Sequence, residues 1–378
     1  MSYDPDLRAR GFLLRATCML VVFFCLSTAA NTVDAQTLAY VTHTVDDKVS
    51  VINTESNTVI TSIPVGNDPA GLAITPDGTR VYVTNQVDHT VSVIDAATHT
   101  VIAIIPVGSD TGGGFPQDIA ITPDSTRAYT VNVSGFSSSV IDTATNTVID
   151  TIPLVGFRPF VIAITPDGTR AYVGGRDGFA VIDTATNTAI TTVLTSSLFL
   201  GVAITPDGTR AYMTEANNNS VFVIDTATNT VIATIPVGLF PTGIAITPDG
   251  TRAYVTNQDS NTISVINTAT NTVIATIPAS FQVTDIAIAP DGSRAYATGQ
   301  QGFDAAVIVI DTTTNSVITT IPVSRFAFRI AIGPAPRSPQ TKEQCKNGGW
   351  RNFGPPAGSF KNQGQCVSFI GRSPGARD

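Results

Sequence analysis

The sequence predicts an all-β protein, a seven-bladed β-propeller of four-stranded antiparallel blades. Two blocks repeat along the chain: "ITPDGTR" followed by a tyrosine strand such as "AYVTN", and "IDTATNTVI". The second block starts at residues 52, 94, 141, 182, 224, 266 and 310, which are 41 to 47 residues apart. This period is typical of a propeller blade, and seven copies indicate seven blades. Charged residues make up only 13%, which suits short buried strands joined by turns.

The strands of one blade follow from the alternation of apolar and polar residues. In the best-preserved copy we expect four strands. Strand A is "GIAIT" (243–247), strand B "RAYVTN" (252–257), strand C "TISVIN" (262–267) and strand D "NTVIATIP" (271–278). Apolar side chains occupy both faces of these strands, as expected where sheets pack on sheets.

The two ends of the chain complete one blade. Residues 37–64 supply strands B, C and D only, and an orphan strand A, "FRIAIG", lies at 328–333. Pairing the two segments removes two free sheet edges, which would otherwise favour aggregation. We therefore expect a three-plus-one ring closure.

The recurring polar residues are expected to form turns. Pro248 presets φ for a type I turn, and Asp249 and Gly250 complete it between strands A and B. Asn229 and its equivalents suit a left-handed position between strands C and D, and His99 takes that place in the second copy. Six near-identical copies of the first turn argue against a single catalytic centre there.

Residues 1–35 are predicted to be a secretory signal peptide. Arg8, Arg10 and Arg15 precede the apolar run at 16–30, and small residues favour cleavage after Ala35, with Ala30 as an alternative. The run is too short for a comfortable membrane span, so no transmembrane segment is expected after cleavage. We therefore expect an exported protein, in the periplasm, outside the cell or on its surface.

The propeller is expected to span 36–333, followed by a linker (334–344) and a small cysteine-paired segment (345–378). Cys345 and Cys366 are the two cysteines beyond the signal, and in an exported protein they most simply form one disulfide. Residues 36–333 carry 24 acidic and 11 basic side chains, whereas 334–378 carry seven basic and two acidic. The acidic body argues against nucleic acid as a partner.

The candidate site lies on the face formed by the B–C and D–A loops, because those loops vary between copies while the A–B and C–D turns do not. Alignment on Pro69, Pro116 and Pro241 gives one position per D–A loop, and charged residues at the start of strand A face the same channel mouth. The predicted ligand-binding residues are Asp68, Phe115, Arg158, Leu198, Phe240, Gln282, Phe326, Asp118, Asp285 and Arg329. Phe157, Phe160, Phe199, Phe281 and Phe328 are expected nearby, and the alternative is that the phenylalanines only plug the ring.

Catalysis has little support in the sequence, and no cofactor is expected. His43 and His89 lie in adjacent B–C loops near Asp46, Asp47 and Asp88, so they are weak candidates for a metal or for acid–base chemistry. The alternative is that both are ordinary loop residues.

The motifs "AYVTN", "ITPDGTR", "IDTATNTVI" and "IPVG" together resemble the YVTN family of β-propeller repeat proteins, over roughly 37–333. The resemblance implies an exported, usually bacterial or archaeal, binding or scaffold protein without a universal catalytic motif. Related propellers include lactone hydrolases and quinone-cofactor dehydrogenases. The tryptophan-rich docking repeats of the latter are missing, because the only Trp is Trp350.

Three hypotheses of function follow. The first is a non-enzymatic binding or scaffold protein, monomeric, that uses the variable face for a small ligand or for an envelope protein or polysaccharide. The second is an enzyme of the lactone-hydrolase type. The third is a cell-surface structural protein tethered through the basic tail.

Overall fold

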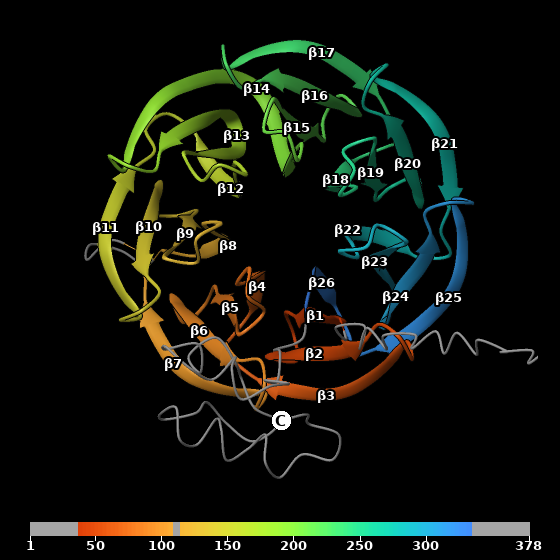
Figure 1. The fold of residues 1–378 in the computed structure, drawn as a ribbon, viewed down its shortest axis with the longest axis horizontal. Helices are drawn as coiled ribbons and strands as arrows, with labels where there is room; N and C mark the ends of the chain where they lie inside the picture. The colour runs from red at the N-terminus through yellow and green to blue at the C-terminus, as the bar shows by residue number, and fades with distance from the viewer. Residues whose placement is uncertain (1–36, 109–113, 335–378) are drawn as a thin grey trace, which may run out of the picture. The chain divides into compact units, whose positions relative to one another are not determined.

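The computed structural model describes residues 37–108 and 114–334. Within these ranges the regular structure is 26 β-strands. They form six antiparallel sheets that follow one another around a ring, with one strand of each repeat facing its centre (Figure 1). This is a β-propeller arrangement. The described ranges contain no helix long and apolar enough to cross a membrane.

Five of the sheets have four strands. The sheet that holds both ends of the ring contains β26 (Ala327–Pro334), β1 (Thr37–His43), β2 (Lys48–Asn53) and β3 (Thr58–Pro64). The next two contain β4 (Pro69–Ile74), β5 (Arg80–Asn85), β6 (Thr90–Asp95) and β7 (Thr100–Pro106), and β8 (Pro116–Ile121), β9 (Arg127–Asn132), β10 (Ser137–Asp142) and β11 (Thr147–Pro153). The last two contain β18 (Pro241–Ile246), β19 (Arg252–Asn257), β20 (Thr262–Asn267) and β21 (Thr272–Pro278), and β22 (Gln282–Ile288), β23 (Arg294–Gln301), β24 (Asp304–Asp311) and β25 (Ser316–Val323).

The remaining sheet has six strands. It contains β12 (Arg158–Ile164), β13 (Arg170–Asp183), β14 (Thr188–Ile204), β15 (Arg210–Glu215), β16 (Ser220–Asp225) and β17 (Thr230–Pro236). The prediction of seven separate four-stranded blades is therefore wrong. The seven sequence repeats are distributed over six sheets, and the fourth and fifth repeats share one.

The reason for the shared sheet is a missing strand break. Most outer strands end at a proline, as β3 does at Pro64, and several inner strands begin with one, as β4 does at Pro69. Proline has no backbone N–H and so weakens ladder pairing at that point, and β25 continues only one residue past Pro322. Residues 188–204 contain no proline, and β14 runs through both strand positions for 17 residues. The tail expected to be disulfide-linked through Cys345 and Cys366 lies outside the described residues.

The expected ring closure is confirmed. β26 pairs antiparallel with β1, with Tyr40 opposite Ala331 and Val41 opposite Ile330. Strands from the two ends of the ring thus lie side by side in one sheet (Figure 1).

The recurring polar cluster around "TPDGTR" is a turn, as expected. The Thr247 hydroxyl donates to Asp249 Oδ1 at 2.5 Å, and Asp249 Oδ1 accepts the Thr251 amide at 3.0 Å. Gly250 has a φ of 72°, a conformation that glycine adopts without strain. The turn thus satisfies its own polar groups and positions Arg252 at the start of β19.

In six of the seven repeats, an arginine and a tyrosine of strand B bind the C–D turn of the next repeat. Arg252 Nη1 donates to the Thr312 carbonyl at 2.5 Å, and the Tyr254 hydroxyl donates to Asn315 Oδ1 at 2.7 Å. Asn315 has a φ of 53°, the left-handed conformation expected between strands C and D. The equivalent tyrosine–asparagine pairs are Tyr82–Asn146, Tyr129–Asn187, Tyr172–Asn229, Tyr212–Asn271 and Tyr296–Asn57.

One of these tyrosine hydrogen bonds is missing. Tyr40 is the strand-B tyrosine of the first repeat, and by register its partner is His99, which has a φ of 53°. The Tyr40 hydroxyl and His99 Nδ1 are both buried without a hydrogen-bond partner. Burial lowers the pKa of His99, so the imidazole is neutral at pH 7. Because these two polar groups are unsatisfied, the contact between Tyr40 and His99 stabilises the ring less than the six tyrosine–asparagine hydrogen bonds do.

We expect His99→Asn to stabilise the protein by about 1 kcal/mol, because asparagine gives the Tyr40 hydroxyl the acceptor found in the six other repeats. Urea unfolding measures the change. The control is the same substitution in a Tyr40→Phe background, where no hydroxyl needs a partner. An equal gain in both backgrounds would show that the Tyr40 hydroxyl is not involved.

Candidate functional site

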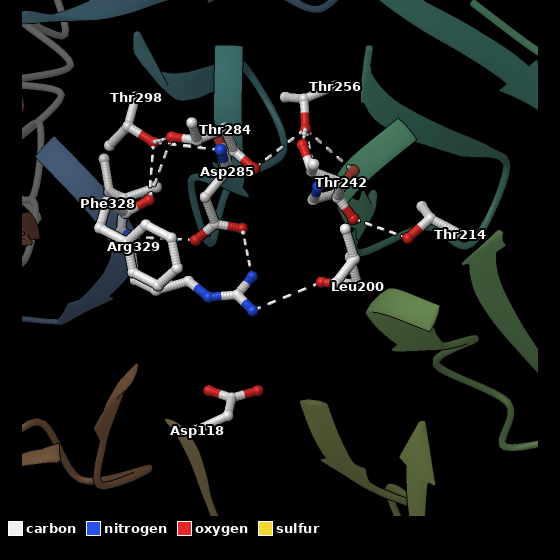
Figure 2. Close-up of polar contacts among 12 residues, drawn as sticks. Asp118, Leu200, Thr214, Thr242, Thr256, Thr284, Asp285, Thr298, Phe328 and Arg329 are labelled. Atoms are coloured by element: carbon white, nitrogen blue, oxygen red, sulfur yellow. Dashed lines mark hydrogen bonds and ion pairs between the residues drawn. The ribbon is translucent and has the colours of Figure 1, made fainter. Parts of the chain in front are cut away.

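Bulges in the innermost strands shape the wall of the central channel. The register shifts between Pro116 and Asp118 in β8 and between Val283 and Asp285 in β22. A buried strand-B threonine holds the irregular segment of β22, whereas Val131 lies opposite the one in β8. The Asp285 amide donates to Thr298 Oγ1 at 3.1 Å, and the Thr298 hydroxyl donates to the Phe328 carbonyl of the next innermost strand at 3.1 Å (Figure 2). Consecutive residues of the bulged strands therefore face the channel.

A pocket of about 230 Å³ opens at this wall. Its apolar surface comes from Phe160, Leu200 and Phe328, and Arg329 forms part of its lining. The polar side chains that complete it are Gln117, Thr242, Gln258 and Thr284. Gln86 donates to Gln117 Oε1, which fixes the orientation of that amide.

Beside this pocket lies a smaller chamber of about 170 Å³, lined by Asp118, Asp285, Arg329 and aliphatic residues. Arg329 Nη1 donates to Asp285 Oδ1 at 3.3 Å, and Nη2 donates to the Leu200 carbonyl of β14 at 3.4 Å. The guanidinium lies 5.4 Å from the Phe328 ring centre, and its Nε is buried without a partner. Because Arg329 lines both cavities, it separates the chamber from the pocket.

The two aspartates differ in their partners. Asp285 accepts the Ile330 amide at 2.9 Å in addition to Arg329. Asp118 accepts the Ile162 amide at 3.1 Å, and its carboxylate faces the guanidinium without a direct ion pair (Figure 2). Removal from water raises the pKa of Asp118 to about 6, against the opposing effect of the Arg329 charge, and it also raises the pKa of Asp285.

Glycines in neighbouring innermost strands make room for both aspartates. A Cβ on Gly71 would lie 2.5 Å from Asp118 Cα, and one on Gly243 would lie 2.6 Å from Asp285 Oδ1. No real side chain tolerates such distances, so each aspartate depends on the glycine beside it.

Of the predicted site residues, the structure brings together Asp118, Asp285 and Arg329. The other seven occupy the corner before each innermost strand or its first residues, and none lines the pocket of about 230 Å³. Four of them have left-handed backbones, with φ values between 40° and 55°: Asp68, Phe115, Phe240 and Phe326. Of the remaining three, Arg158 and Gln282 are exposed and Leu198 is half-buried.

Sequence reasoning missed five pocket residues: Gln117, Leu200, Thr242, Gln258 and Thr284. Four of them, Gln117, Leu200, Thr242 and Thr284, lie two residues after the aligned D–A position, where a regular alternation would turn them away from the channel. The bulge changes that direction. For Thr242 and Thr284 the signal was the strand-B threonine of "YVTN", whose hydroxyl accepts the amide of the next residue, whereas for Gln117 no such signal exists because Val131 takes that place.

His43 occupies the place of the motif asparagine. It is fully buried, with Nε2 2.8 Å from Ser50 Oγ and Nδ1 3.2 Å from the Arg325 carbonyl. Asn85 makes the equivalent contact to Ser92 Oγ at 2.9 Å. Because a carbonyl only accepts, Nδ1 carries the proton and Nε2 accepts from Ser50. Burial lowers the pKa of His43 to about 4.

His89 caps a D–A corner. Its Nδ1 accepts the Phe115 amide at 3.2 Å, as Asp47 Oδ1 accepts the Asp68 amide and Asn219 Oδ1 the Phe240 amide. The ring also packs edge-on against Phe115, with centroids 5.1 Å apart. Residues 37–108 and 114–334 contain no group of three or more His, Cys, Asp or Glu placed to hold a metal ion.

The chain matches no protein-family model and no curated protein. Solved structures do resemble it. Hydrazine synthase from Kuenenia stuttgartiensis is 22% identical, over 75% of this chain and 92% of that chain, with a TM-score of 0.63. A functionally unknown protein from Desulfotomaculum acetoxidans DSM 771 is 20% identical, over 78% and 98%, with a TM-score of 0.69. Dihydro-heme d1 dehydrogenase NirN, in complex with DHE, is 15% identical, over 79% and 75%, with a TM-score of 0.59.

At these identities the comparisons support the β-propeller fold alone. Membership of the YVTN family stays a prediction from the repeat motifs.

We expect His43→Asn to keep the fold and to reduce the loss of unfolding free energy at acidic pH. The folded pKa of about 4 lies below the usual 6.5, so the unfolded state binds more protons and stability falls as the pH drops from about 6.5 to 4. The full effect is about 3 kcal/mol. Urea unfolding of both proteins across this range measures it, and parallel curves would contradict a neutral buried imidazole.

We expect Asp118→Asn to stabilise the protein by about 1 to 2 kcal/mol at about pH 8, and to have little effect at about pH 3.5. The folded pKa of about 6 lies above the usual value of 3.8, so the cost of the desolvated charge is complete above about pH 6 and disappears only below the usual value. Asp259→Asn on an exposed loop is the control and should change neither value. A loss of stability at pH 8 would mean that Arg329 needs the Asp118 charge.

Proposed function

We propose that the chain is an exported binding protein that holds a small uncharged ligand in the pocket beside Arg329. The observation that carries the proposal is the composition of that pocket: two phenylalanines and a leucine next to amide and hydroxyl groups. Apolar walls with a few oriented polar groups are the usual design of a small-molecule site.

The charges near the pocket favour an uncharged ligand. Arg329 directs its Nη1 to Asp285 and its Nη2 to a backbone carbonyl, so its charge is already opposed. With Asp118 ionised the cluster has a net charge of −1, which disfavours an anion. A cation in the pocket would meet the guanidinium before either carboxylate, because Arg329 lines the pocket and the aspartates do not.

The polar groups of the pocket favour a ligand with hydrogen-bonding substituents. The Thr284 hydroxyl donates to the Phe328 carbonyl at 3.2 Å and so keeps lone pairs free to accept. Gln117 accepts from Gln86 through Oε1 and keeps its NH₂ group free to donate. An aromatic or aliphatic ring with a hydroxyl or carbonyl group matches this pattern.

Export is part of the proposal and rests on the basic and apolar residues of 1–35. We also propose a second, larger partner, an envelope protein or polysaccharide. It would contact the varied B–C and D–A loops around the pocket. The dihydro-heme d1 dehydrogenase acts on a far larger ligand than a pocket of about 230 Å³ accepts, so its substrate is not carried over.

The test is calorimetric titration with 2-naphthol, 2-naphthoate and 2-naphthylmethylammonium, which share one ring system and differ in charge. We expect 2-naphthol to bind with a Kd below about 1 mM and to bind at least about tenfold more tightly than either ion. Leu200→Trp fills the pocket and should abolish binding. Leu239→Trp, on an exposed loop of the same face, is the matched control. Tighter binding of an ion, or binding unaffected by Leu200→Trp, would contradict the proposal.

A further inference from the structure

The opposite face of the ring, built from the A–B and C–D turns, carries a regular array of carboxylates. Paired strands such as β19 and β20 place the residue after the A–B turn opposite the residue before the C–D turn, as in Arg252 and Asn267. Both kinds of turn therefore lie at the same end of the sheets. We call this surface the turn face. Its aspartates are Asp77, Asp124, Asp167, Asp207, Asp249 and Asp291 in A–B turns and Asp95, Asp142, Asp183, Asp225 and Asp311 in C–D turns.

The aspartates of the turn face lack direct ion-pair partners in the described residues. Hydrogen bonds from neighbouring hydroxyls and amides lower the pKa of Asp249 and of Asp311. The nearby arginines point between the repeats instead, as Arg252 does toward the Thr312 carbonyl.

Grooves between neighbouring A–B turns repeat across this face. One of about 270 Å³ is lined by Asp249 and Asp291 with Arg252 and threonines, and one of about 300 Å³ by Asp124 and Asp167 with Arg127 and threonines. Each groove thus places carboxylates from two successive turns beside a space large enough for a lysine or arginine side chain.

The described part of the chain ends at this face. Pro334 closes β26, and a Cβ on Gly78 would lie 2.1 Å from the Pro334 carbonyl oxygen, so Pro334 sits against the A–B turn that contains Asp77. The 44 residues that follow hold seven basic and two acidic side chains. At about 3.3 Å per extended residue they are long enough to reach any groove of the ring.

We propose that the segment 335–378 docks on the turn face of its own ring, with its lysines and arginines beside the aspartates of the A–B and C–D turns. Charge complementarity and the exit point at Pro334 favour this segment over a separate partner on the turn face. Exposed ion pairs are individually weak and screened by salt. The covalent connection supplies a high effective concentration, so several weak pairs suffice. The proposal concerns the face opposite the ligand pocket and is independent of the proposed function.

Trp350 gives a direct readout, because it is the only tryptophan and lies in this segment. The experiment measures acrylamide quenching of Trp350 in the chain from Gln36 to Asp378, at low and high NaCl. Acrylamide is uncharged, so salt does not alter its own approach. We expect the Stern–Volmer constant to rise about twofold between about 20 mM and 1 M NaCl, because the Debye length falls to about 3 Å.

A charge-only variant locates the contact. Asp95→Asn, Asp225→Asn and Asp311→Asn combined remove three charges and keep the turn, since Asn53 and Asn267 already make the same caps in two repeats. At low salt this triple variant should quench at least about 1.5-fold more than the parent. Asp177→Asn, Asp259→Asn and Asp304→Asn combined, on exposed loops of the other face, are the matched control and should equal the parent.

Two results would overturn the proposal. One is a quenching constant that does not depend on salt, or that responds equally to both triple variants. The other is a constant that changes with protein concentration, because the segment would then dock on a second copy of the chain. A constant independent of concentration, raised by salt and by the first triple variant only, would support it.

Discussion

The inner wall of this ring depends on a hydroxyl that each of several repeats contributes from strand B. Thr298 accepts the amide of a bulged residue in its own repeat and donates to the innermost strand of the next one. Thr256 accepts the Gly243 amide in the same way. An extra residue in an innermost strand would otherwise leave a backbone amide unsatisfied. The hydroxyl thus satisfies the bulge in these repeats, whereas β8 and β12 bulge opposite Val131 and Gly174. In both cases the bulge turns consecutive side chains into the channel, where the pocket and the charged cluster are formed.

A second set of contacts joins strand B of one repeat to the C–D turn of the next. In six repeats the strand-B arginine donates to a backbone carbonyl in the C–D turn of the next repeat, and the strand-B tyrosine donates to the asparagine of that turn. These contacts use residues that look reactive in the sequence. The polar residues of the motif are therefore explained by hydrogen bonds between repeats. His99 interrupts the set at one junction, and His43 and Glu215 replace the motif asparagine at two other positions. Glu215 is fully buried and accepts the Leu198 amide at 3.1 Å.

The all-β class, the order of strands, the turns and the ring closure could be predicted, because each depends on local signals such as Pro248, Gly250 and the tyrosine of strand B. The number of sheets could not, because counting repeats assumes a break after each one, and residues 188–204 lack the proline that makes it. The charged members of the site, Asp118, Asp285 and Arg329, were accessible because ionisable residues in an innermost strand are conspicuous. Leu200, Thr242 and Thr284 were not, because their direction depends on a bulge that period-two alternation hides.

The position of β26 has a consequence for how the protein is made. β1 is synthesised first and waits for a partner that is about 290 residues away in the sequence. At about 5 to 20 residues per second, that interval lasts roughly 15 to 60 seconds. During this interval the uncharged edge of β1 has no partner strand, and the ring cannot close. A chain released before residue 327 lacks β26 and cannot close the ring. The topology therefore makes the closed ring depend on synthesis through β26.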